Sequence, residues 1–257
     1  MKRPAPEHLA VIRQFEAAGF RAWPATAVHY DGTWAVRLTA SHPSHRLNSV
    51  NPLDPSDDWR IEERIERLTR HFRAFGRPFT FRISPLAAPA VSAHLASQGW
   101  RKIKTTLVLR RALNERVFAD AMHQIPLKDL DRFVTAAFQV HGYQDKLRPG
   151  FTEVISSIKP RAGLFILEQG NVPVSTAICV HDGRLAGLFE VATVEAERGK
   201  GFGKRMLLSA LKWAYSHGAR EAWLQVEQSN AAALNLYRSL GFEEVYRYHY
   251  RQPGSEA

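Results

Sequence analysis

A glycine-rich turn constrains the fold of this chain more than any other stretch. The turn, Arg198-Gly199-Lys200-Gly201-Phe202-Gly203-Lys204, lies between an apolar run at residues 185–194 and an apolar-periodic segment at residues 202–215. This order predicts a strand, a tight turn and a helix. Alternating glycines remove the β-carbons that would keep a diphosphate away from the backbone, and the helix that follows directs its free N–H groups to the same place. The turn is therefore predicted to bind an anion.

The glycine spacing excludes two other phosphate loops. A P-loop requires Ser or Thr at position 205, where this chain has Arg205. A dinucleotide fingerprint requires glycine at Lys204 if it begins at Gly199, and glycine or alanine at Met206 if it begins at Gly201. Both patterns fail, so neither kind of nucleotide site is predicted here.

Two motifs together resemble one enzyme family. The pattern Arg198-x-x-Gly201-x-Gly203 is similar to the pyrophosphate loop of the GCN5-related N-acetyltransferases (GNAT), which use acetyl-coenzyme A. After a predicted strand at residues 221–227, residues 230–242 resemble the second motif of the same family, N-x-x-A-x-x-L-Y-x-x-x-G-F, and match it at every marked position. The resemblance covers residues 115–251. It implies an α/β (α+β) fold with mixed, mostly antiparallel sheets and an N-acetyltransferase activity.

The resemblance also implies which residues hold acetyl-coenzyme A. The turn would wrap the pyrophosphate through backbone N–H groups, and the strand before it would pair with the pantetheine arm as an extra strand would. The asparagine of the second motif is a helix N-cap by residue type and also contacts the cofactor arm in the family. The predicted cofactor-binding residues are Val191, Ala192, Thr193, Arg198, Gly199, Lys200, Gly201, Phe202, Gly203, Lys204 and Asn230. The family often has a proline just before the turn, whereas this chain has Val194-Glu195-Ala196-Glu197.

The predicted acid is Tyr237, which matches the tyrosine of the second motif. A phenol with a pKa near 10 is protonated at neutral pH and can give its proton to a departing thiolate. The other interpretation of Tyr237 is a core tyrosine on a helix that covers the sheet.

The base has three candidates. In several relatives a glutamate stands five residues before the motif asparagine, but here that place is Gln225, which cannot take a proton. Glu190, Glu227 or water could act instead. We favour Glu190, because it directly precedes the segment that would pair with the cofactor arm.

The predicted reaction is direct transfer of acetyl to a primary amine. An acetyl-cysteine route is not expected, because Cys179 lies on a different predicted strand from the cofactor-binding segment and has no paired histidine. The spacing of His141, Cys179 and His181 does not indicate a metal site, so no metal is expected. The acceptor is expected to be a small-molecule or peptide amine, and its identity is left open.

The first half of the chain echoes the second. Gly99-Trp100 and Gly241-Phe242 each follow a predicted short helix, 142 positions apart (241 minus 99). At this offset Arg198 falls on Ser56, and no glycine lies between Gly32 and Gly76. We therefore predict tandem GNAT-like domains: a degenerate domain at residues 1–112 without a cofactor loop, and a catalytic domain at residues 113–257. Separate origin of the two halves is the alternative.

The expected elements follow from periodicity and turn residues. The first half predicts a helix at 7–18 capped by Gly19, a hairpin of 25–30 and 34–39, a helix at 57–75, a strand at 79–83, a helix at 90–97 and a strand at 103–109. The second half predicts a strand at 117–125, helices at 127–140 and 152–158, and an antiparallel meander of strands at 164–168, 173–181 and 185–194. The polar loop Arg46-Leu47-Asn48-Ser49 is either solvated or hydrogen-bonded to an acceptor.

Composition limits the remaining classes. The 257 residues include one cysteine, which excludes an internal disulfide, and contain no apolar run near the ~18 residues that a membrane helix needs. A cytoplasmic protein without membrane partners is expected. The net charge of +10 favours an anionic cofactor, but the basic residues form no tract, so nucleic acid is not an expected partner. The rival hypothesis is a non-catalytic module whose basic surface holds nucleic acid or an acidic protein. A homodimer is left open.

Overall fold

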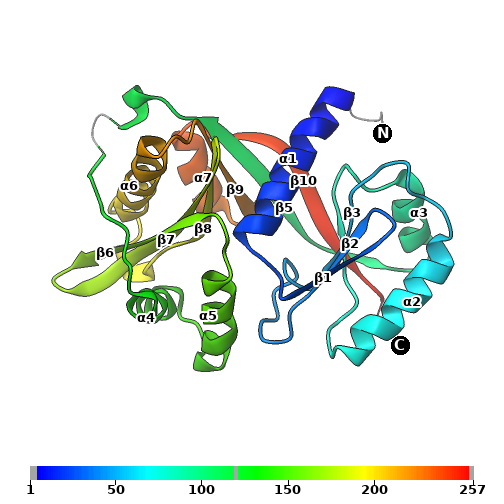
Figure 1. Cartoon of the computed structure of the whole chain (residues 1–257). Coiled ribbons are helices and arrows are strands. Elements are labelled where there is room, and N and C mark those ends of the chain that lie inside the picture. Colours follow the sequence, from blue (N-terminus) through cyan, green and yellow to red (C-terminus); the bar gives the residue numbers. More distant parts are fainter. Residues whose placement is uncertain (1–4, 119–120, 255–257) are drawn as a thin grey trace. The chain divides into compact units, whose positions relative to one another are not determined.

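The computed structural model describes residues 5–118 and 121–254, which form two compact units (Figure 1). The first contains residues 5–108, 227–229 and 245–254, and the second contains the other described residues from 109 to 244. A domain boundary at residue 112 stays a prediction. The structure adds that residues 245–254, near the end of the chain, belong to the first unit.

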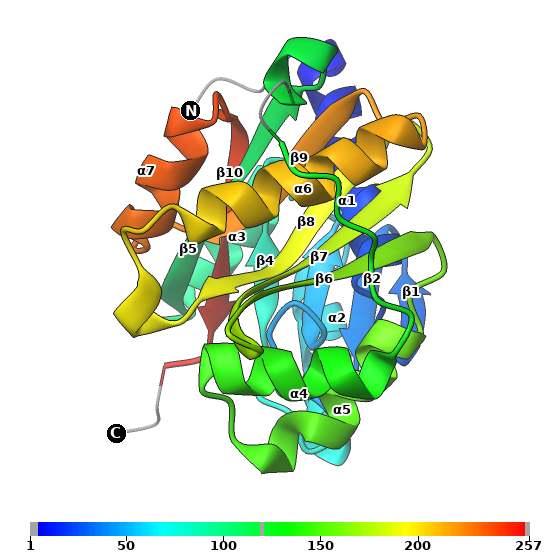
Figure 2. The ribbon, with the colours of Figure 1, turned by 90° about the vertical axis from the view of Figure 1, so that its left-hand side faces the viewer.

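The second unit is a sheet with helices on both faces. Its strand order is β9-β8-β7-β6, with β6, β7 and β8 antiparallel and β8 parallel to β9. Helices α6 and α4 both pack on β6, β7 and β8, and they lie on opposite faces of these strands (Figure 2). The elements are η1 (Glu115–Phe118), α4 (Leu130–His141), η2 (Asp145–Leu147), α5 (Arg148–Ser156), β6 (Arg161–Gln169), β7 (Val172–Asp182), β8 (Leu185–Thr193), η3 (Glu195–Glu197), α6 (Phe202–Ser216), β9 (Glu221–Glu227) and α7 (Ala231–Ser239).

The predicted meander of β6, β7 and β8 is confirmed, and local sequence explains it. Two-residue turns join the strands, with Gly170 and Asn171 at φ +58° and +63° and Gly183 at φ +61°. Left-handed residues of this kind match the twist of a hairpin. The three strands are buried through most of their length because helices cover both faces, so they appear in the sequence as apolar runs without strict alternation.

In the first unit the strands run in the order β1-β2-β3-β4-β10-β5. Strand β10 pairs antiparallel with β4, so a strand from residues 243–252 lies between two strands of the first half of the chain. The elements are α1 (Pro6–Ala22), β1 (Ala27–Asp31), β2 (Trp34–Leu38), β3 (Ser49–Pro52), α2 (Ile61–Ala74), β4 (Phe81–Ile83), α3 (Pro89–Ser97), β5 (Arg101–Ala112) and β10 (Glu243–Gln252). Residues 109–112 of β5 and 243–244 of β10 belong to the second unit.

Strand β2 is buried on both faces. Trp34, Val36 and Leu38 join a hydrophobic core with residues of α2 and α3 such as Phe72. Arg37, on the other face, places its guanidinium 4.4 Å from the ring centroid of Phe20 on α1. The alternation of a strand thus separates the α2–α3 face from the α1 face.

The two halves of the sequence repeat one order of elements. The run β3-α2-β4-α3-β5 matches β8-α6-β9-α7-β10, and in both runs the first two strands are parallel, through Val50 and Phe81 in one and residues 185–188 in the other. Both runs turn into their last strand through a left-handed glycine, Gly99 at φ +70° and Gly241 at φ +75°. The internal echo in the sequence therefore corresponds to a structural repeat.

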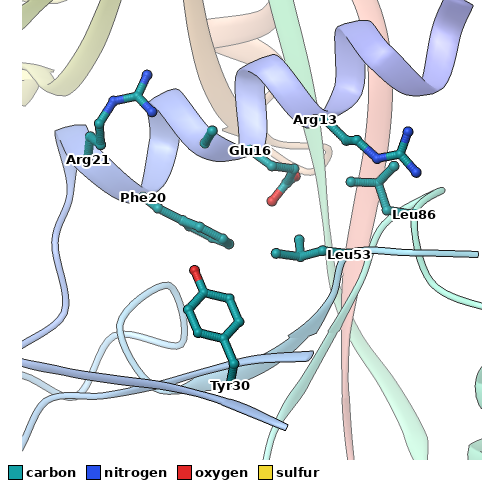
Figure 3. Close-up of a pocket in the computed structure, with 8 residues that line it drawn as sticks. Arg13, Glu16, Phe20, Arg21, Tyr30, Leu53 and Leu86 are labelled. Atoms are coloured by element: carbon teal, nitrogen blue, oxygen red, sulfur yellow. The ribbon is translucent and has the colours of Figure 1, made fainter. Parts of the chain in front are cut away.

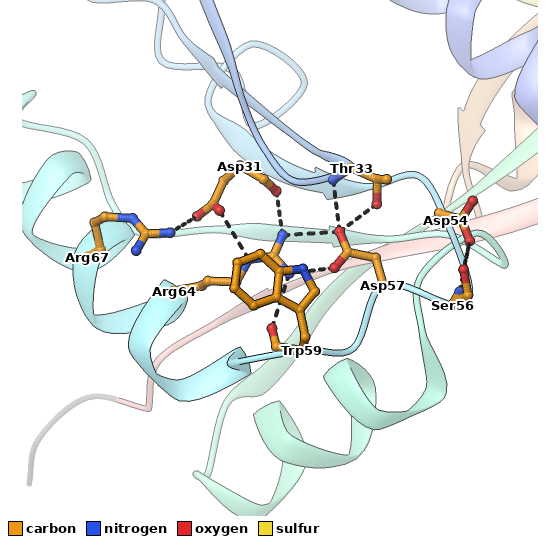
Figure 4. A network of polar contacts seen from close by, with 8 residues as sticks. All are labelled: Asp31, Thr33, Asp54, Ser56, Asp57, Trp59, Arg64 and Arg67. Carbon is orange, nitrogen blue, oxygen red and sulfur yellow. Dashed lines mark hydrogen bonds and ion pairs between the residues drawn. The ribbon is translucent and has the colours of Figure 1, made fainter.

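The turn between β3 and α2 contains a buried ionic network (Figure 4). Arg64 is 1% exposed and donates to both carboxylate oxygens of Asp57, at 2.7 and 3.2 Å, and to Asp31 Oδ1 at 3.2 Å. Thr33 donates to Asp57 Oδ2 from its backbone N–H at 2.8 Å and from its hydroxyl at 2.7 Å. The Arg64 guanidinium carbon lies 3.6 Å from the ring centroid of Trp34. Side chains of the turn and of the elements around it therefore fill the space before α2.

Two predictions about elements are wrong. Gly19 does not cap the first helix, because α1 continues through it to Ala22 and the Trp23 N–H donates to the Gly19 carbonyl. This end of the helix is mostly buried. The predicted strand at 117–125 is wrong for its described residues, since Phe118 lies in η1 against Tyr215 and 121–125 form no strand. Residues 119–120 of that prediction lie outside the described part of the chain.

The prediction that the loop Arg46-Leu47-Asn48-Ser49 is solvated is also wrong. Asn48 is buried, and its side chain accepts from Thr39 N–H and donates to the carbonyls of His42 and Ser44. The amide therefore holds the loop closed and is not solvated. The sequence also missed β3, because its four buried residues, Ser-Val-Asn-Pro, carry no apolar pattern.

Candidate functional site

The glycine turn leaves the start of α6 open. Gly199 and Gly201 have φ values of +79° and +82°, which L-residues with side chains rarely adopt. Gly201 is the N-cap of α6 and supplies no side chain, so the first N–H groups of the helix have no side-chain cap. A β-carbon at either glycine would meet nothing within 4 Å. The bare backbone and the positive end of the helix dipole suit an anion.

Gly203 is where three elements converge. A β-carbon at this position would lie 3.3 Å from Thr193 Oγ1, at the end of β8, and 3.4 Å from Leu236 Cδ2, on α7. The contacts are tighter than ordinary van der Waals distances, so only glycine fits without displacement of a neighbour. The turn, the end of β8 and the helix of the second motif therefore meet at one point.

Basic side chains surround the turn. Arg198 donates from Nε to the Thr193 carbonyl at 3.3 Å, which ties the turn to the end of β8. Lys200 pairs with Glu197 at 3.0 Å, and Lys204 is exposed on the first turn of α6. An exposed pair of this kind contributes little to stability. Both lysines are thus available to neutralise a bound anion.

Strands β8 and β9 separate before the turn. Their parallel pairing runs from Leu185 and Glu221 to Leu188 and Leu224, while β8 continues to Thr193 paired with β7 through Ser175. Within the described chain, residues 190–193 have no register with β9. An extended ligand could therefore add as a strand along this part of β8.

A β-bulge lies at the point of separation. The register between β7 and β8 shifts between Thr176 and Ile178, which face Ala192 and Phe189, so two residues of β8 occupy the space of one. One of them, Glu190, has φ +49°, a conformation that favours glycine. The bulge therefore reorients Glu190 out of the regular alternation of the strand.

Two aromatic residues contact the Glu190 carboxylate. The Tyr143 hydroxyl donates to Glu190 Oε2 at 2.9 Å, and His141 Nε2 lies 3.7 Å from the same oxygen. The side chains of His141 and Glu190 are each 15% exposed. Sequence spacing gave no signal for this cluster, because 47 residues separate Tyr143 from Glu190.

Helix α7 places the two polar residues of the second motif. Asn230 caps the helix, and its Oδ1 accepts from Ala233 N–H at 3.1 Å. Tyr237 is 7% exposed, and its ring packs edge-on against Phe242 at 5.9 Å. Burial raises the pKa of Tyr237 to about 12, so the phenol stays protonated at neutral pH.

Comparison with known proteins assigns this chain to a family. The family model described as "Probable histone acetyltransferase Rv0428c C-terminal" matches residues 9–251, which include nearly all of both units. This chain belongs to that family. An N-acetyltransferase from Bacillus subtilis (strain 168), "Uncharacterized N-acetyltransferase YobR", is 26% identical over 252 residues and covers 93% of this chain and 98% of its own length.

Solved structures share the fold of this family member. A GCN5-related N-acetyltransferase from Kribbella flavida is similar with a TM-score of 0.68 and 19% identity, over 95% of this chain and 96% of its own. A tandem GNAT protein from the clavulanic acid biosynthesis pathway is similar with a TM-score of 0.64 and 14% identity, over 100% and 91%. The predicted tandem GNAT-like fold is confirmed.

This acetyltransferase family member is therefore an N-acetyltransferase of the GNAT type. The rival hypothesis of a non-catalytic module is not carried further. The finer assignments, namely the cofactor, the acceptor and the role of each residue, rest on the geometry described above.

Two other candidates in this acetyltransferase have different surroundings. Glu227 pairs with Lys104 at 2.9 Å within the first unit, so its charge is compensated. Cys179 is 0% exposed in the middle of β7, and burial raises the pKa of its thiol well above the ordinary value. A protonated, buried thiol is a poor nucleophile.

Among the described residues, no group of three or more His, Cys, Asp or Glu is arranged to hold a metal ion. No helix in the same part of the chain is long and apolar enough to cross a membrane. A cavity of about 340 Å³ lies in the first unit beneath α1 (Figure 3). Glu16 in its wall is already hydrogen-bonded by Arg82 and Tyr246, and no predicted site residue lines it.

Proposed function

We propose that the second unit transfers the acetyl group of acetyl-coenzyme A to a primary amine by direct attack. The observation that carries this proposal is the uncapped start of α6 behind Gly199 and Gly201, next to the unpaired edge of β8. An anion and an extended arm can be held side by side there. Coenzyme A has both parts.

The residues present fit this cofactor. The backbone of residues 199–204 would hold the pyrophosphate, with charge from Lys200 and Lys204. Residues 191–193 would pair with the pantetheine arm, and Asn230, whose Oδ1 is used by the helix cap, keeps its amide N–H groups for the same arm. The open space at Gly199 and Gly201 supports the fit, because a β-carbon there would project toward the ligand.

One side chain would accept a proton and another would donate one during the reaction. When bound, acetyl-coenzyme A supplies an activated acetyl group as a thioester. Glu190 accepts a proton from the acceptor ammonium, which makes the amine a nucleophile. Tyr237 keeps its proton at neutral pH and can donate it to the thiolate that leaves. Cys179 takes no part, because its thiol is buried and protonated.

The acceptor is proposed to be a small-molecule or peptide amine that arrives as a cation. Support comes from the half-buried carboxylate of Glu190 at the separation of β8 and β9, which attracts an ammonium group. The first unit is proposed to bind no cofactor. Its corresponding turn has no glycine and is closed by Asp57 and Arg64.

A thiol-release assay tests the proposal. Purified protein is mixed with acetyl-coenzyme A and a panel of primary amines: a polyamine, an aminoglycoside, an amino sugar and peptides with free N-termini. We expect thiol release with at least one amine, an acetylated product by mass spectrometry and intersecting initial-rate lines. Acetyl-coenzyme A at a hundred times its dissociation constant should stabilise the fold by about 2.7 kcal/mol. Absence of thiol release together with absence of a melting shift would refute the proposal.

A further inference from the structure

The cluster around Glu190 contains two residues with no role in the motifs. We propose that Tyr143 and His141 are positioning residues of Glu190: together they fix its carboxylate so that Oε1 faces the acceptor amine. This inference rests on the proposed function, since it concerns the group that takes the proton from the amine.

The end of α4 brings the two rings together. The helix ends at His141, and Gly142 takes the left-handed conformation at φ +69°, which reverses the chain so that Tyr143 N–H donates to the Phe138 carbonyl at 3.1 Å. The rings of His141 and Tyr143 then stack at 4.6 Å and 17°. The glycine cap of the helix is thus what places both rings on the same side of the turn.

Tyr143 is held firmly. Its ring makes edge contacts with Phe138 at 5.5 Å and with Phe151 at 5.9 Å, in addition to the stack on His141. A tyrosine fixed by three rings presents its hydroxyl in one direction. That hydroxyl donates to Glu190 Oε2, and the contact restricts rotation of the carboxylate.

The two oxygens of Glu190 are not equivalent. Oε2 accepts from Tyr143 at 2.9 Å and lies 3.7 Å from His141 Nε2, while no such contact to Oε1 is found in the described part of the chain. Oε1 is therefore the oxygen left to receive a proton from an acceptor amine. A carboxylate that uses one oxygen for anchoring and the other for chemistry is pre-organised for proton transfer.

The backbone of Glu190 is held by the same cluster. His141 Nε2 lies 3.3 Å from the Glu190 carbonyl oxygen, and the Thr176 hydroxyl donates to that oxygen at 3.3 Å. These contacts support the left-handed φ of +49°, which a residue with a side chain adopts only when its surroundings impose it. His141 therefore acts on both the bulge and the carboxylate.

Three polar groups of the described chain contact Glu190: His141 at the end of α4, Tyr143 just after it and Thr176 on β7. Tyr143 and His141 lie at the carboxylate, and the Thr176 hydroxyl bonds the backbone carbonyl. Loss of either contact at the carboxylate should leave Oε1 less precisely placed for proton transfer.

The test compares Tyr143→Phe and His141→Gln with the wild type, using the amine that gives the highest rate in the thiol-release assay. Phenylalanine keeps the ring stack and removes only the hydroxyl. Glutamine keeps an N–H donor and removes the ring. For Tyr143→Phe we expect kcat to fall about tenfold while KM for the amine changes by less than about twofold, because the lost hydrogen bond misplaces the group that takes the proton. His141→Gln should lower kcat in the same way.

Two comparisons make the result specific. The dissociation constant of acetyl-coenzyme A, measured by calorimetry, should stay within about twofold in both variants. Tyr215→Phe, in which a half-buried tyrosine on α6 packed against Phe118 loses its hydroxyl, is the matched control and should leave kcat and KM unchanged.

The outcomes separate the two proposals. An active wild type with unchanged kcat in Tyr143→Phe would overturn the positioning role and leave the proposed function standing. A fall in kcat accompanied by weaker binding of acetyl-coenzyme A, or matched by the same fall in Tyr215→Phe, would also overturn it, because a merely structural role predicts that result. A wild type that acetylates no amine would instead remove the proposed function on which the inference rests.

Discussion

Leu95 and Tyr237 occupy the same place in two similar helix ends. The Leu95 carbonyl accepts from Trp100 N–H at 2.9 Å, and the Tyr237 carbonyl accepts from Phe242 N–H at 3.0 Å. The residues are 142 positions apart, which is the offset that aligns Gly99 with Gly241. Both helices therefore end with the same backbone hydrogen bond, but only the second has a tyrosine at this position.

The hydroxyl of Tyr237 should matter for rate and not for folding. Tyr237→Phe removes the proposed proton donor and is expected to lower kcat by about 10²- to 10³-fold, with little change in affinity for acetyl-coenzyme A. Because burial raises the pKa of Tyr237 to about 12, its ionisation should cause no loss of wild-type rate between pH 7 and 10. Steady-state kinetics over that pH range check both points. A variant with full kcat would show that Tyr237 is only a core tyrosine.

The glycines of the turn should be required for cofactor binding. Gly201→Val places a branched side chain on the bare backbone at φ +82° and should weaken acetyl-coenzyme A binding at least tenfold by calorimetry. Backbone strain alone is controlled by Gly76→Val, which has a similar φ of +67° and open space but lies at the end of α2. Equal affinities in the two variants would contradict an anion site at the turn.

Direct attack predicts that the thiol is dispensable. Cys179→Ala removes a small buried side chain, which should cost about 1 kcal/mol of stability and leave kcat within about threefold of the wild type. The native thiol should also resist alkylation, because burial raises its pKa and hides it from solvent. An inactive variant that still folds and binds acetyl-coenzyme A would instead indicate an acetyl-cysteine route.

The features that could be predicted from the sequence are those that depend on local backbone conformation. Alternating glycines before an apolar helix specify the turn at Gly199 and Gly201, and Asn230 three residues before Ala233 specifies a cap, so both motifs could be placed without any tertiary information. The same reasoning predicted β9 at its observed bounds, 221–227.

What the sequence could not predict depends on contacts between distant segments. Strand β3 was missed because burial of Ser49 and Asn51 is imposed by its neighbours, not by its own composition. No pattern in the sequence connects His141 with Glu190, because 49 residues separate them and the β-bulge that contains Glu190 has no local signature. The helix predicted at 57–75 from its apolar spacing begins later, at Ile61, because the carboxylate of Asp57 is bound by Arg64 in the turn before α2.

The network of Asp57 and Arg64 gives the last prediction (Figure 4). At the repeat offset Asp57 corresponds to Gly199 (199 minus 142), so a carboxylate stands in the first unit where the second has a bare glycine. Burial alone would raise the pKa of Asp57, but hydrogen bonds from Arg64 and Thr33 outweigh it and lower that pKa below its ordinary value. A carboxyl whose pKa is lowered in the folded state stabilises the fold above its unfolded pKa, and the contribution disappears as the pH falls through the lowered value.

Asp57→Asn should therefore destabilise the protein by about 2 kcal/mol at pH 7, because the buried guanidinium loses one of its two anionic partners while Asp31 remains. The difference from the wild type should shrink as the pH falls below about 4, where the unfolded chain takes up the proton first. Urea unfolding at a series of pH values measures this, with Asp58→Asn as the exposed neighbouring control. Affinity for acetyl-coenzyme A should be unchanged in both variants. A pH-independent difference would mean that Asp57 contributes by packing alone, and a loss of acetyl-coenzyme A affinity specific to Asp57→Asn would mean that the first unit takes part in cofactor binding.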